Sequence, residues 1–544
     1  MTASSKSSGM SDGRDGMRMG KRTRLVATLA AAVALLAASL VAQPAGAQSP
    51  RGQSGDRTLR LPYDLAAFGG IKFDPITVPS PADWYVQQWL YDSLLRQNAD
   101  GTYSPGIAKS ATVTDPQTIV IELRPGQQFS DGSPVDAEAV KFSIERNKAS
   151  GNVGAIRVEL NQLQSITVDS PTKLTIKLAT PVAGQFFNLL ANGETYIVSP
   201  TAVQSGTTLD QKPVGAGPFV LESFAPESSA VFVRNEDFID NKKVKIDRIE
   251  LVQVATDPTG QATVNALLDD IVDVNNMSLS LAQVAPLEGA GLKVDSVSSD
   301  SSYTFGALCK NKPPFDNVKV RQALNYATDR DEINEVVYQG GSEPMQAHWT
   351  KGHALFSSAL DGYYDRNVKK AKKLLKEAGM ENLEFDMYSN LTPDLETMGT
   401  LLKEQWAEAG ITVNLKSTTN IVEDFFTQVN APVSLIPLRR AGLDKVTRNL
   451  TPGSIGDICN YDDPKVNGYV AQLRELDAGS KEYADVWHEM DEYIVKNALE
   501  LYVVWTPTIN AYDSSTVKKV VYRPDVFGAP RFDVYKMQVG SSSG

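Results

Sequence analysis

Three histidines and two pairs of adjacent acidic residues are the side chains best suited to catalysis or metal binding. His348 and His353 are five residues apart, which does not place them on one face of a helix, and no Glu or Cys supplies the remaining spacing of a zinc site. We therefore expect a surface or loop role for these histidines and no metal site. The pairs Asp269-Asp270 and Asp462-Asp463 would diverge on a helix or strand, so we interpret them as solvated surface charge.

Nucleophile and phosphate-binding motifs are missing. The sequence has no G-x-S-x-G elbow and no P-loop. The segment 215–220 (GAGPFV) begins like a dinucleotide-binding loop, but Pro and Phe follow its second glycine and Val220 takes the place of the third. We interpret it as a tight turn leading into a strand. The sequence thus predicts no catalytic residues, no enzymatic activity and no cofactor.

The first 47 residues have the pattern of a secretory signal peptide. Basic residues precede an apolar run from Leu25 to Val41, and Ala45-Gly46-Ala47 follows as a small-x-small cleavage site. The alternative is an uncleaved membrane anchor, because a run of 17 residues is at the short limit for spanning a bilayer. Either way, we expect the rest of the chain outside the cytoplasm, in the periplasm, cell envelope or medium. No cysteine closely follows the run, so we expect no lipoprotein tether.

Cys309 and Cys459 are the only cysteines. In an exported protein, an even and sparse cysteine count favours one disulfide bond. Two isolated buried thiols are the alternative.

Length and charge narrow the class of protein further. Residues 48–544 are too many for one hydrophobic core, so we expect two or three domains. The net charge is −12, and residues 1–47 carry six basic and two acidic residues, or +4, so the remainder is near −16. Such a surface repels phosphate backbones, which argues against a nucleic-acid partner.

The clearest secondary-structure pattern lies at 368–417. Apolar residues at helical spacing end at Gly379, and Leu383, Phe385 and Met387 then alternate with polar residues as in a half-buried strand. The pattern repeats at once, with a second helix ending at Gly410 and a second alternating strand at 411–415. Helix–Gly–strand twice in succession predicts parallel strands with crossover helices, and so an α/β fold.

Two other regions have different patterns. Residues 112–180 predict a strand at 118–123, a helix from an Asp136 cap through Arg146, and strands at 164–168 and 173–178, an α+β unit rich in hairpins. Residues 246–274 predict a strand at 246–254, a helix at 258–269 and a strand at 271–274.

Several separated segments resemble the family 5 extracellular solute-binding proteins, the dipeptide, oligopeptide and nickel receptors of ABC importers. They are in the family's order and cover nearly all of the chain after residue 47. The matching segments are 91–95 (YDSLL), 123–126 (LRPG), 129–135 (FSDGSPV), 142–146 (FSIER), 213–219 (PVGAGPF), 312–327 (KPPFDNVKVRQALNYA), 371–379 (AKKLLKEAG) and 410–413 (GITV).

The resemblance implies a bilobal type II periplasmic-binding-protein fold with an extra α+β domain. By analogy, lobe I would combine residues 48–92, 213–303 and 504–544. The extra domain would be 93–212, and lobe II would be 304–503. The resemblance also implies a monomer that captures a peptide or peptide-like solute by hinge closure and delivers it to a membrane permease.

The expected ligand site departs from the pattern of the peptide-binding members. Their second-lobe "WxxDxxDP" segment is replaced here by 438–445 (LRRAGLDK), which is similar to a "GRxDP" variant with Arg440 and Asp444 as the nearest matches. Lys445 stands where the family has proline. A guanidinium there favours a carboxylate or phosphate, and a solvated arginine pair is the alternative.

Three tryptophans are candidates for the wall of the cleft, with core packing as the rival interpretation: Trp84, Trp349 and Trp505. Two other functions stay open, a secreted sensor or scavenger on the same fold, and a secreted hydrolase. The sequence does not name the ligand.

Overall fold

The computed structural model describes residues 56–541 except 66–69, 78–80, 99–101, 151–157, 256, 258, 277, 391, 419–432, 453–456, 458, 477 and 525–529. The predicted signal peptide at 1–47 lies outside the described residues. Within them, no helix combines the length and the apolar character needed to cross a membrane.

The first sheet brings the start of the described chain beside a segment far along the sequence. Its strand order is β1-β10-β9-β8, and β1 pairs with β10 in parallel while the other pairs are antiparallel. Helix α2 packs on this sheet through Trp89, whose ring meets that of Phe232 edge to face at 5.4 Å. The C-terminal segment adds a further contact, because the Tyr85 hydroxyl donates to the Phe532 carbonyl at 2.9 Å. The elements are β1 (Thr58–Tyr63), α2 (Pro81–Leu90), β8 (Phe219–Ala225), β9 (Ser229–Arg234) and β10 (Arg248–Gln253).

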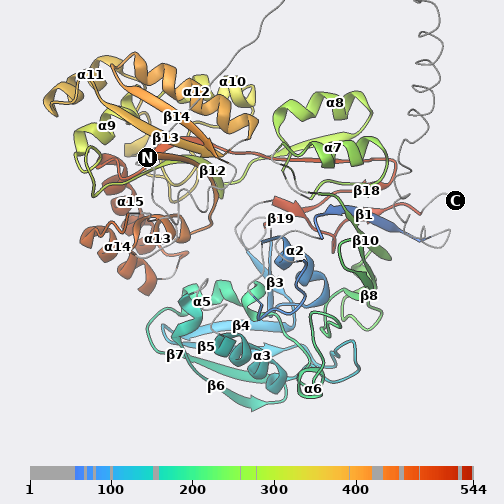
Figure 1. Ribbon diagram of the computed structural model, residues 1–544. Helices are drawn as coiled ribbons and strands as arrows, with labels where there is room; N and C mark the ends of the chain where they lie inside the picture. Colours follow the sequence, from blue (N-terminus) through green and yellow to red (C-terminus); the bar gives the residue numbers. More distant parts are fainter. Residues whose placement is uncertain are drawn as a thin grey trace, which may run out of the picture. The chain divides into compact units, whose positions relative to one another are not determined.

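The second sheet is antiparallel with the order β4-β5-β7-β6, and it confirms the strands and helix predicted within 112–180. Helix α3 begins where Asp136 accepts a hydrogen bond from the Ala139 amide at 2.9 Å, and it runs four residues beyond Arg146. Figure 1 shows α3 and α5 beside this sheet. The elements are β4 (Ala108–Asp115), β5 (Thr118–Leu123), α3 (Ala137–Ser150), β6 (Leu163–Ser170), β7 (Lys173–Leu178), α5 (Ala183–Leu189) and α6 (Pro200–Gln204). The hairpin β2 (Leu95–Gln97) and β3 (Tyr103–Pro105) lies beside β4.

The third sheet has the order β14-β13-β15-β12-β16. Strand β13 is parallel to β14 and β15, whereas β12 is antiparallel to β15 and β16. The predicted helix–strand–helix–strand unit is confirmed as α11, β13, α12 and β14, with Gly379 and Gly410 in the left-handed conformation after the helices. The strands are β12 (Ser302–Leu308), β13 (Glu384–Asn390), β14 (Thr412–Thr418), β15 (Val433–Arg439) and β16 (Leu501–Trp505).

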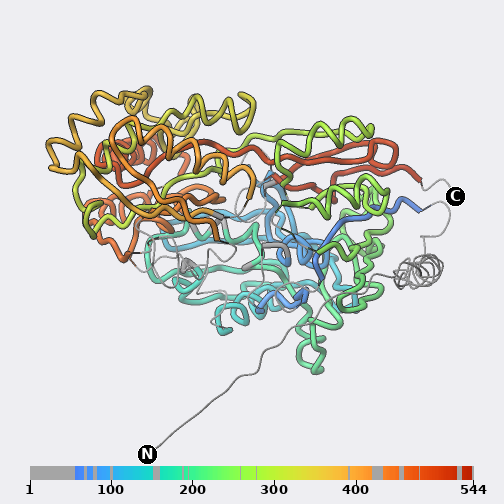
Figure 2. The backbone as a smooth tube through the Cα atoms, turned by 45° about the horizontal axis from the view of Figure 1, so that its top comes forward, coloured from blue at the N-terminus to red at the C-terminus, as the bar shows by residue number. Residues whose placement is uncertain are grey.

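Seven helices pack around this third sheet among the described residues (Figure 1). They are α9 (Val318–Ala327), α10 (Arg330–Tyr338), α11 (Val368–Glu377), α12 (Pro393–Ala407), α13 (Asp444–Leu450), α14 (Pro464–Glu475) and α15 (Lys481–Lys496). Figure 2 shows the orange and red segments of this part interleaved with yellow-green ones, because β12 comes from much earlier in the chain than β15 and β16.

Two chain segments connect the third sheet to a smaller unit. Strands β11 (Lys293–Val297) and β17 (Thr508–Tyr512) pair antiparallel beside α7 (Gln261–Leu268) and α8 (Val284–Gly289). Strand β11 continues into β12, and β16 continues into β17, so a two-stranded ribbon joins the units. The pairing is interrupted between them at 298–301 and 506–507, where the Thr506 amide donates to the Ser302 carbonyl at 2.9 Å.

The strand predicted at 271–274 is wrong. Only Val274 forms an isolated bridge, with Tyr512. The amides of Ile271 and Val272 instead donate to the Ala266 carbonyl at 2.9 and 3.3 Å, so this segment caps the C-terminus of α7. Apolar side chains alone do not distinguish a strand from a buried helix cap. The strand predicted at 246–254 and the helix predicted at 258–269 are confirmed as β10 and α7, each shorter at its ends.

Buried side chains form separate cores. One continuous core spans the first two sheets, a second surrounds the third sheet, and a small third one lies between α7, α8 and β17. The remaining short elements are β18 (Val517–Lys519) with β21 (Gln538–Val539) and β19 (Tyr522–Pro524) with β20 (Pro530–Phe532). Short 3-10 helices occur at Val158–Gln162, Gly193–Thr195, Asn241–Lys243, Leu281–Gln283 and Ser358–Leu360.

Candidate functional site

A buried lysine lies between two tryptophans next to the ribbon that joins the units. Lys445 is the second residue of α13, which starts a few residues after β15 ends. Its Nζ lies 3.5 Å from the ring centre of Trp349 and 5.0 Å from that of Trp505. Nζ donates one hydrogen bond, to the His348 carbonyl at 2.5 Å. The two indole faces therefore hold the ammonium by cation–π interaction.

The loops around this lysine are hydrogen-bonded to residues 298–301, which connect β11 to β12. The Arg440 amide donates to the Ser301 carbonyl at 2.8 Å. Asp300 accepts hydrogen bonds from the hydroxyl and the amide of Thr350, which follows Trp349 in the chain. Arg440, Asp300 and Thr350 are each partly exposed, whereas Lys445 and both tryptophans are buried. The cluster thus has a buried floor and a partly exposed rim.

His353 packs against one of the two tryptophans of the buried floor. Its ring stacks on that of Trp349 at a centroid distance of 3.9 Å and an interplanar angle of 6°. Burial lowers the pKa of His353, and the neighbouring Lys445 lowers it further while Asp300 opposes this. Burial also lowers the pKa of Lys445 from 10.5 to about 7, although Asp300 and Asp491 act in the opposite direction.

A buried set of charges surrounds His348, the residue that precedes Trp349. His348 Nδ1 lies 2.6 Å from a carboxylate oxygen of Asp491 in α15, and Nε2 lies 2.9 Å from one of Glu500 just before β16. Burial alone would lower the pKa of His348, but the two carboxylates raise it from 6.5 to about 9. The imidazolium is therefore the favoured form at neutral pH.

Of the surface or loop role predicted for His348, the structure shows a loop position but not a surface one. The residue lies in a loop, but its side chain is 0% exposed. Its two counter-charges are more than 140 residues away in the sequence, so local spacing carries no signal for them. His353 is in a loop and half-buried.

Four of the five predicted ligand-binding residues gather in this cluster. Trp349 and Trp505 flank Lys445, Arg440 lies just before the turn that leads into α13, and Asp444 is the first residue of that helix. Trp84 is elsewhere: it lies in α2, is 2% exposed and packs against Gly193. In the sequence, Lys445 is notable only because it replaces a proline. No sequence pattern indicated Asp300 or the two carboxylates that flank the buried His348.

The two cysteines lie together in the same part of the molecule. Cys309 follows β12 and Cys459 precedes α14; their Cα atoms are 5.4 Å apart and their sulfurs are within bonding distance. Both side chains are buried.

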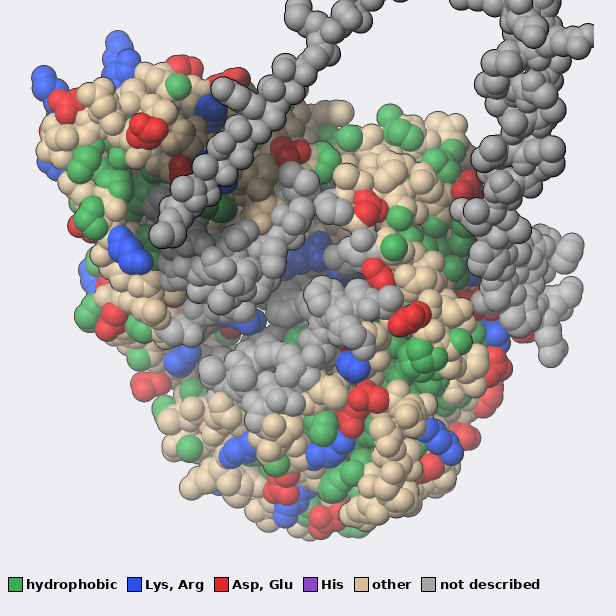
Figure 3. Space-filling view, viewed as in Figure 1, with side chains coloured by type: hydrophobic (Ala, Val, Ile, Leu, Met, Phe, Trp, Pro, Cys, Tyr) green, Lys and Arg blue, Asp and Glu red, His purple; other side chains and the backbone are tan. Residues whose placement is uncertain are grey.

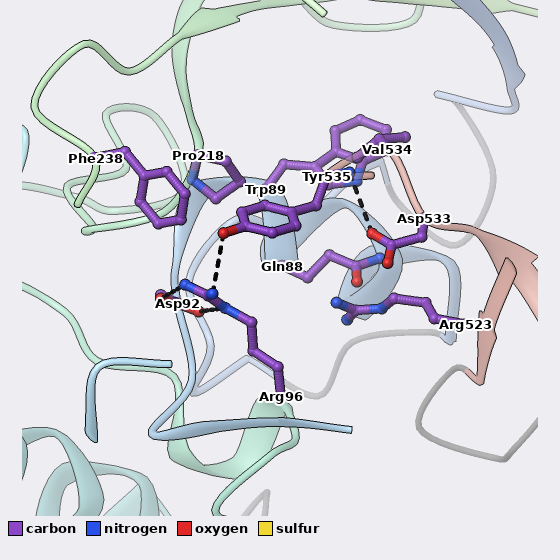
Figure 4. Close-up of a pocket in the computed structure, with 10 residues that line it drawn as sticks. All are labelled: Gln88, Trp89, Asp92, Arg96, Pro218, Phe238, Arg523, Asp533, Val534 and Tyr535. Carbon is purple, nitrogen blue, oxygen red and sulfur yellow. Dashed lines mark hydrogen bonds and ion pairs between the residues drawn. The ribbon is translucent and has the colours of Figure 1, made fainter. Parts of the chain in front are cut away.

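A second polar cluster surrounds Arg96 near the C-terminal segment (Figure 4). The guanidinium pairs with Asp92 and Asp240 and lies 4.8 Å from the ring centre of Tyr535 and 5.4 Å from that of Phe238. The depression beside it has room for about one water molecule. Because Arg96 is already paired with Asp92 and Asp240, this cluster ties chain segments together, and the depression leaves little space for a solute.

Charged side chains of both signs are interspersed over the face shown in Figure 3. Among the described residues, no group of three or more His, Cys, Asp or Glu side chains is arranged to hold a metal ion.

Residues 102–432 match the family model described as bacterial extracellular solute-binding proteins, family 5 middle. Heme-binding protein A of Haemophilus influenzae is 28% identical over 429 residues, which cover 71% of this chain and 75% of that protein. The glutathione-binding protein GsiB of Escherichia coli K12 is 28% identical over 327 residues, which cover 57% of this chain and 59% of GsiB. This second match therefore spans less than two thirds of the relative's length.

Solved structures share the fold over most of the chain. The substrate-binding protein CtaP of Listeria monocytogenes has a TM-score of 0.77 at 20% identity, covering 89% of this chain and 99% of CtaP. A dipeptide-binding protein from Pseudoalteromonas sp. SM9913, in complex with Met-Leu, has a TM-score of 0.73 at 18% identity, covering 89% and 100%. These similarities confirm the predicted α/β, type II periplasmic-binding-protein fold.

Proposed function

The chain belongs to the bacterial extracellular solute-binding proteins, family 5, and we propose that it is the extracytoplasmic substrate-binding subunit of an ABC importer. It captures a peptide or peptide-like solute and delivers it to a membrane permease without changing the solute's covalent bonds. The family match across residues 102–432 is the observation that carries this proposal. The names of its relatives, which bind heme, glutathione or a dipeptide, support a small organic solute as the ligand.

The capture step is hinge closure about the ribbon formed by β11–β12 and β16–β17. Its interrupted pairing at 298–301 and 506–507 supports bending there, because four backbone residues on one strand and two on the other are outside the sheets. A ligand that makes more contacts in the closed form shifts the population toward it. In this proposal lobe I comprises 48–92, 213–303 and 504–544, lobe II comprises 304–503, and 93–212 is the extra domain.

The ligand-facing wall of lobe II is formed by Arg440, Asp444 and Trp349, and Trp505, at the start of the last lobe I segment, lies beside them. The Arg440 amide contacts the 298–301 connection, called the hinge turn below, and Asp444 contacts Thr447 within α13, and these contacts support the assignment. Trp84 stays a predicted wall residue of lobe I. The proposal also includes a cleaved signal peptide, a monomeric exported protein and a disulfide bond between Cys309 and Cys459.

Native mass spectrometry of protein purified from the exported fraction tests this function. We expect a co-purifying small solute, and we expect its addition to stripped protein to reduce the radius of gyration in solution scattering. Conversion of the bound solute into a product, or scattering profiles that do not respond to any solute carried by the native protein, would contradict the proposal.

A further inference from the structure

Lys445 is a buried cation with few partners. Its side chain is 0% exposed, and Nζ makes one hydrogen bond to the described residues although an ammonium has three donors. No carboxylate in the described part of the chain lies within ion-pair distance of Nζ. A buried charge without a counter-ion is costly, so such groups are normally paired.

The neighbouring acidic groups are engaged elsewhere. Asp300, on the hinge turn, accepts from the hydroxyl and amide of Thr350. Asp491, on α15, binds His348, and Glu500 contacts the other nitrogen of the same imidazole. His353 contacts this region by stacking on Trp349. Arg440 approaches it through its backbone amide, and Asp444, the residue before Lys445, accepts from the Thr447 hydroxyl at 3.5 Å. Among the residues that the structure describes, the lysine therefore lacks a committed anion.

The two tryptophans exclude a second cation from the same place. Their faces, at 3.5 and 5.0 Å from Nζ, are already used by the lysine ammonium. A ligand ammonium entering here would meet a like charge instead of an open aromatic box.

The geometry points to Lys445 as an anion-recognition residue: its ammonium pairs with an oxyanion, a carboxylate or phosphate, of the captured solute, beside Arg440 at the partly exposed rim. This inference rests on the proposed function and defines the ligand class more narrowly. The solute presents an oxyanion to lobe II and needs no free ammonium at that end.

Retention of a defined mixture of synthetic di- to pentapeptides without acidic side chains tests the inference. The mixture is offered to stripped full-length protein in three forms: unmodified, N-acetylated and C-terminally methyl-esterified, with native mass spectrometry as the readout. We expect the acetylated form to be retained like the unmodified one and the methyl ester to be retained about tenfold less. Competition by inorganic phosphate distinguishes the two oxyanions: displacement of the acetylated peptides assigns a site that accepts phosphate, and no displacement assigns a carboxylate site.

The variant Lys445→Met removes the charge while filling the same space between the tryptophans, so folding is expected to be preserved. It should retain acetylated and esterified peptides equally. Lys310→Met is the matched control, because Lys310 is another buried lysine of the same core whose Nζ lies 3.4 Å from one carbonyl and 5.4 Å from the ring centre of Tyr461. This control should keep the wild-type preference.

The pH dependence of retention adds an independent readout. With a pKa of about 7 in the empty protein, the protonated fraction of Lys445 falls about fivefold between pH 7 and 8, and retention of acetylated peptides should fall by the same factor. Retention by Lys445→Met should not change over this range. Equal retention of esters and acetylated peptides by the wild type would overturn the inference while leaving solute capture intact, whereas retention of none of the three forms and no native solute would count against the proposed function itself.

Discussion

The pKa values of two buried cationic residues in the second core are shifted in opposite directions. This gives a quantitative prediction for how the free energy of unfolding changes with pH. The pKa of His348 is raised by its carboxylates from 6.5 to about 9. Its contribution to the free energy of unfolding is therefore fully present below pH 6.5 and is lost as pH rises through 9, at about 1.4 kcal/mol per pH unit between these values.

The contribution of Lys445 to the free energy of unfolding changes with pH in the opposite direction. Burial lowers its pKa from 10.5 to about 7, so between these values the unfolded chain binds a proton that the folded protein has released. Stability from this group therefore rises with pH, again by about 1.4 kcal/mol per unit. Between pH 7 and 9 the two contributions cancel, and the net effect of this pair of groups on the free energy of unfolding is close to zero.

Lys445→Met removes the contribution that rises with pH and leaves that of His348. Relative to the wild type, its free energy of unfolding should fall by about 3 kcal/mol from pH 7 to pH 9, because the two-unit interval loses the compensating contribution. Urea unfolding followed by tryptophan fluorescence at pH 7, 8 and 9 measures this slope. All other groups titrate in both proteins, so the difference between them isolates Lys445.

The exposed Lys376→Met, on α11 of the same part of the chain, is the control and should follow the wild type. Substitution by methionine also changes the absolute stability, so only the slope decides. Parallel pH profiles for the wild type and Lys445→Met would refute the burial of a titrating ammonium between the tryptophans.

Three further predictions concern packing and the cross-link. Replacing both Cys309 and Cys459 by serine should lower the free energy of unfolding by about 5 kcal/mol in the chain-entropy model, because the bridge closes a loop of 150 residues; alkylation of two thiols in the native wild type would contradict the bridge. Arg96→Met should cost about 3 kcal/mol in thermal unfolding, because Asp92 loses its buried partner, and an unchanged melting temperature would argue against a buried pair. Trp505→Ala should cost about 4 kcal/mol through the cavity it leaves, with Trp505→Phe as the milder control.

The sequence was sufficient where local pattern decides the structure. The unit at 368–418 is set by apolar spacing within each helix, by alternation within each strand and by two glycines in left-handed conformation, all of which can be seen within a few residues. The Asp136 cap of α3 is of the same kind. The strand expected at 271–274 failed because the amides of Ile271 and Val272 donate to Ala266 in the preceding helix, and side-chain pattern does not indicate where amides donate.

The site was only half predictable for the same physical reason. Aromatic and guanidinium side chains suggest ligand contact by their chemistry alone. The structure brings three residues chosen on this ground, Trp349, Trp505 and Arg440, into one cluster, and their contact with a ligand stays a prediction. A lysine in sequence indicates an exposed position, because lysine is almost never fully buried without a partner. The burial of Lys445 depends on loops about 95 residues before it and a strand 60 residues after it, so only the fold shows it.

The position of Lys445 connects the proposed ligand contact to the proposed hinge through covalent and hydrogen-bonded neighbours. Arg440, five residues earlier, is held by the carbonyl of Ser301, and Trp349 is followed directly by Thr350, which is held by Asp300. Both loops that surround the ammonium are therefore hydrogen-bonded to the same connection at 298–301, the proposed hinge. Under the proposed recognition, an oxyanion that fixes Lys445 and Arg440 also fixes the two loops relative to this turn, so the free energy gained at the charge is available to bias the hinge. A neutral solute with the same apolar contacts lacks this contribution, which is why replacement of the charge is expected to alter closure as well as affinity.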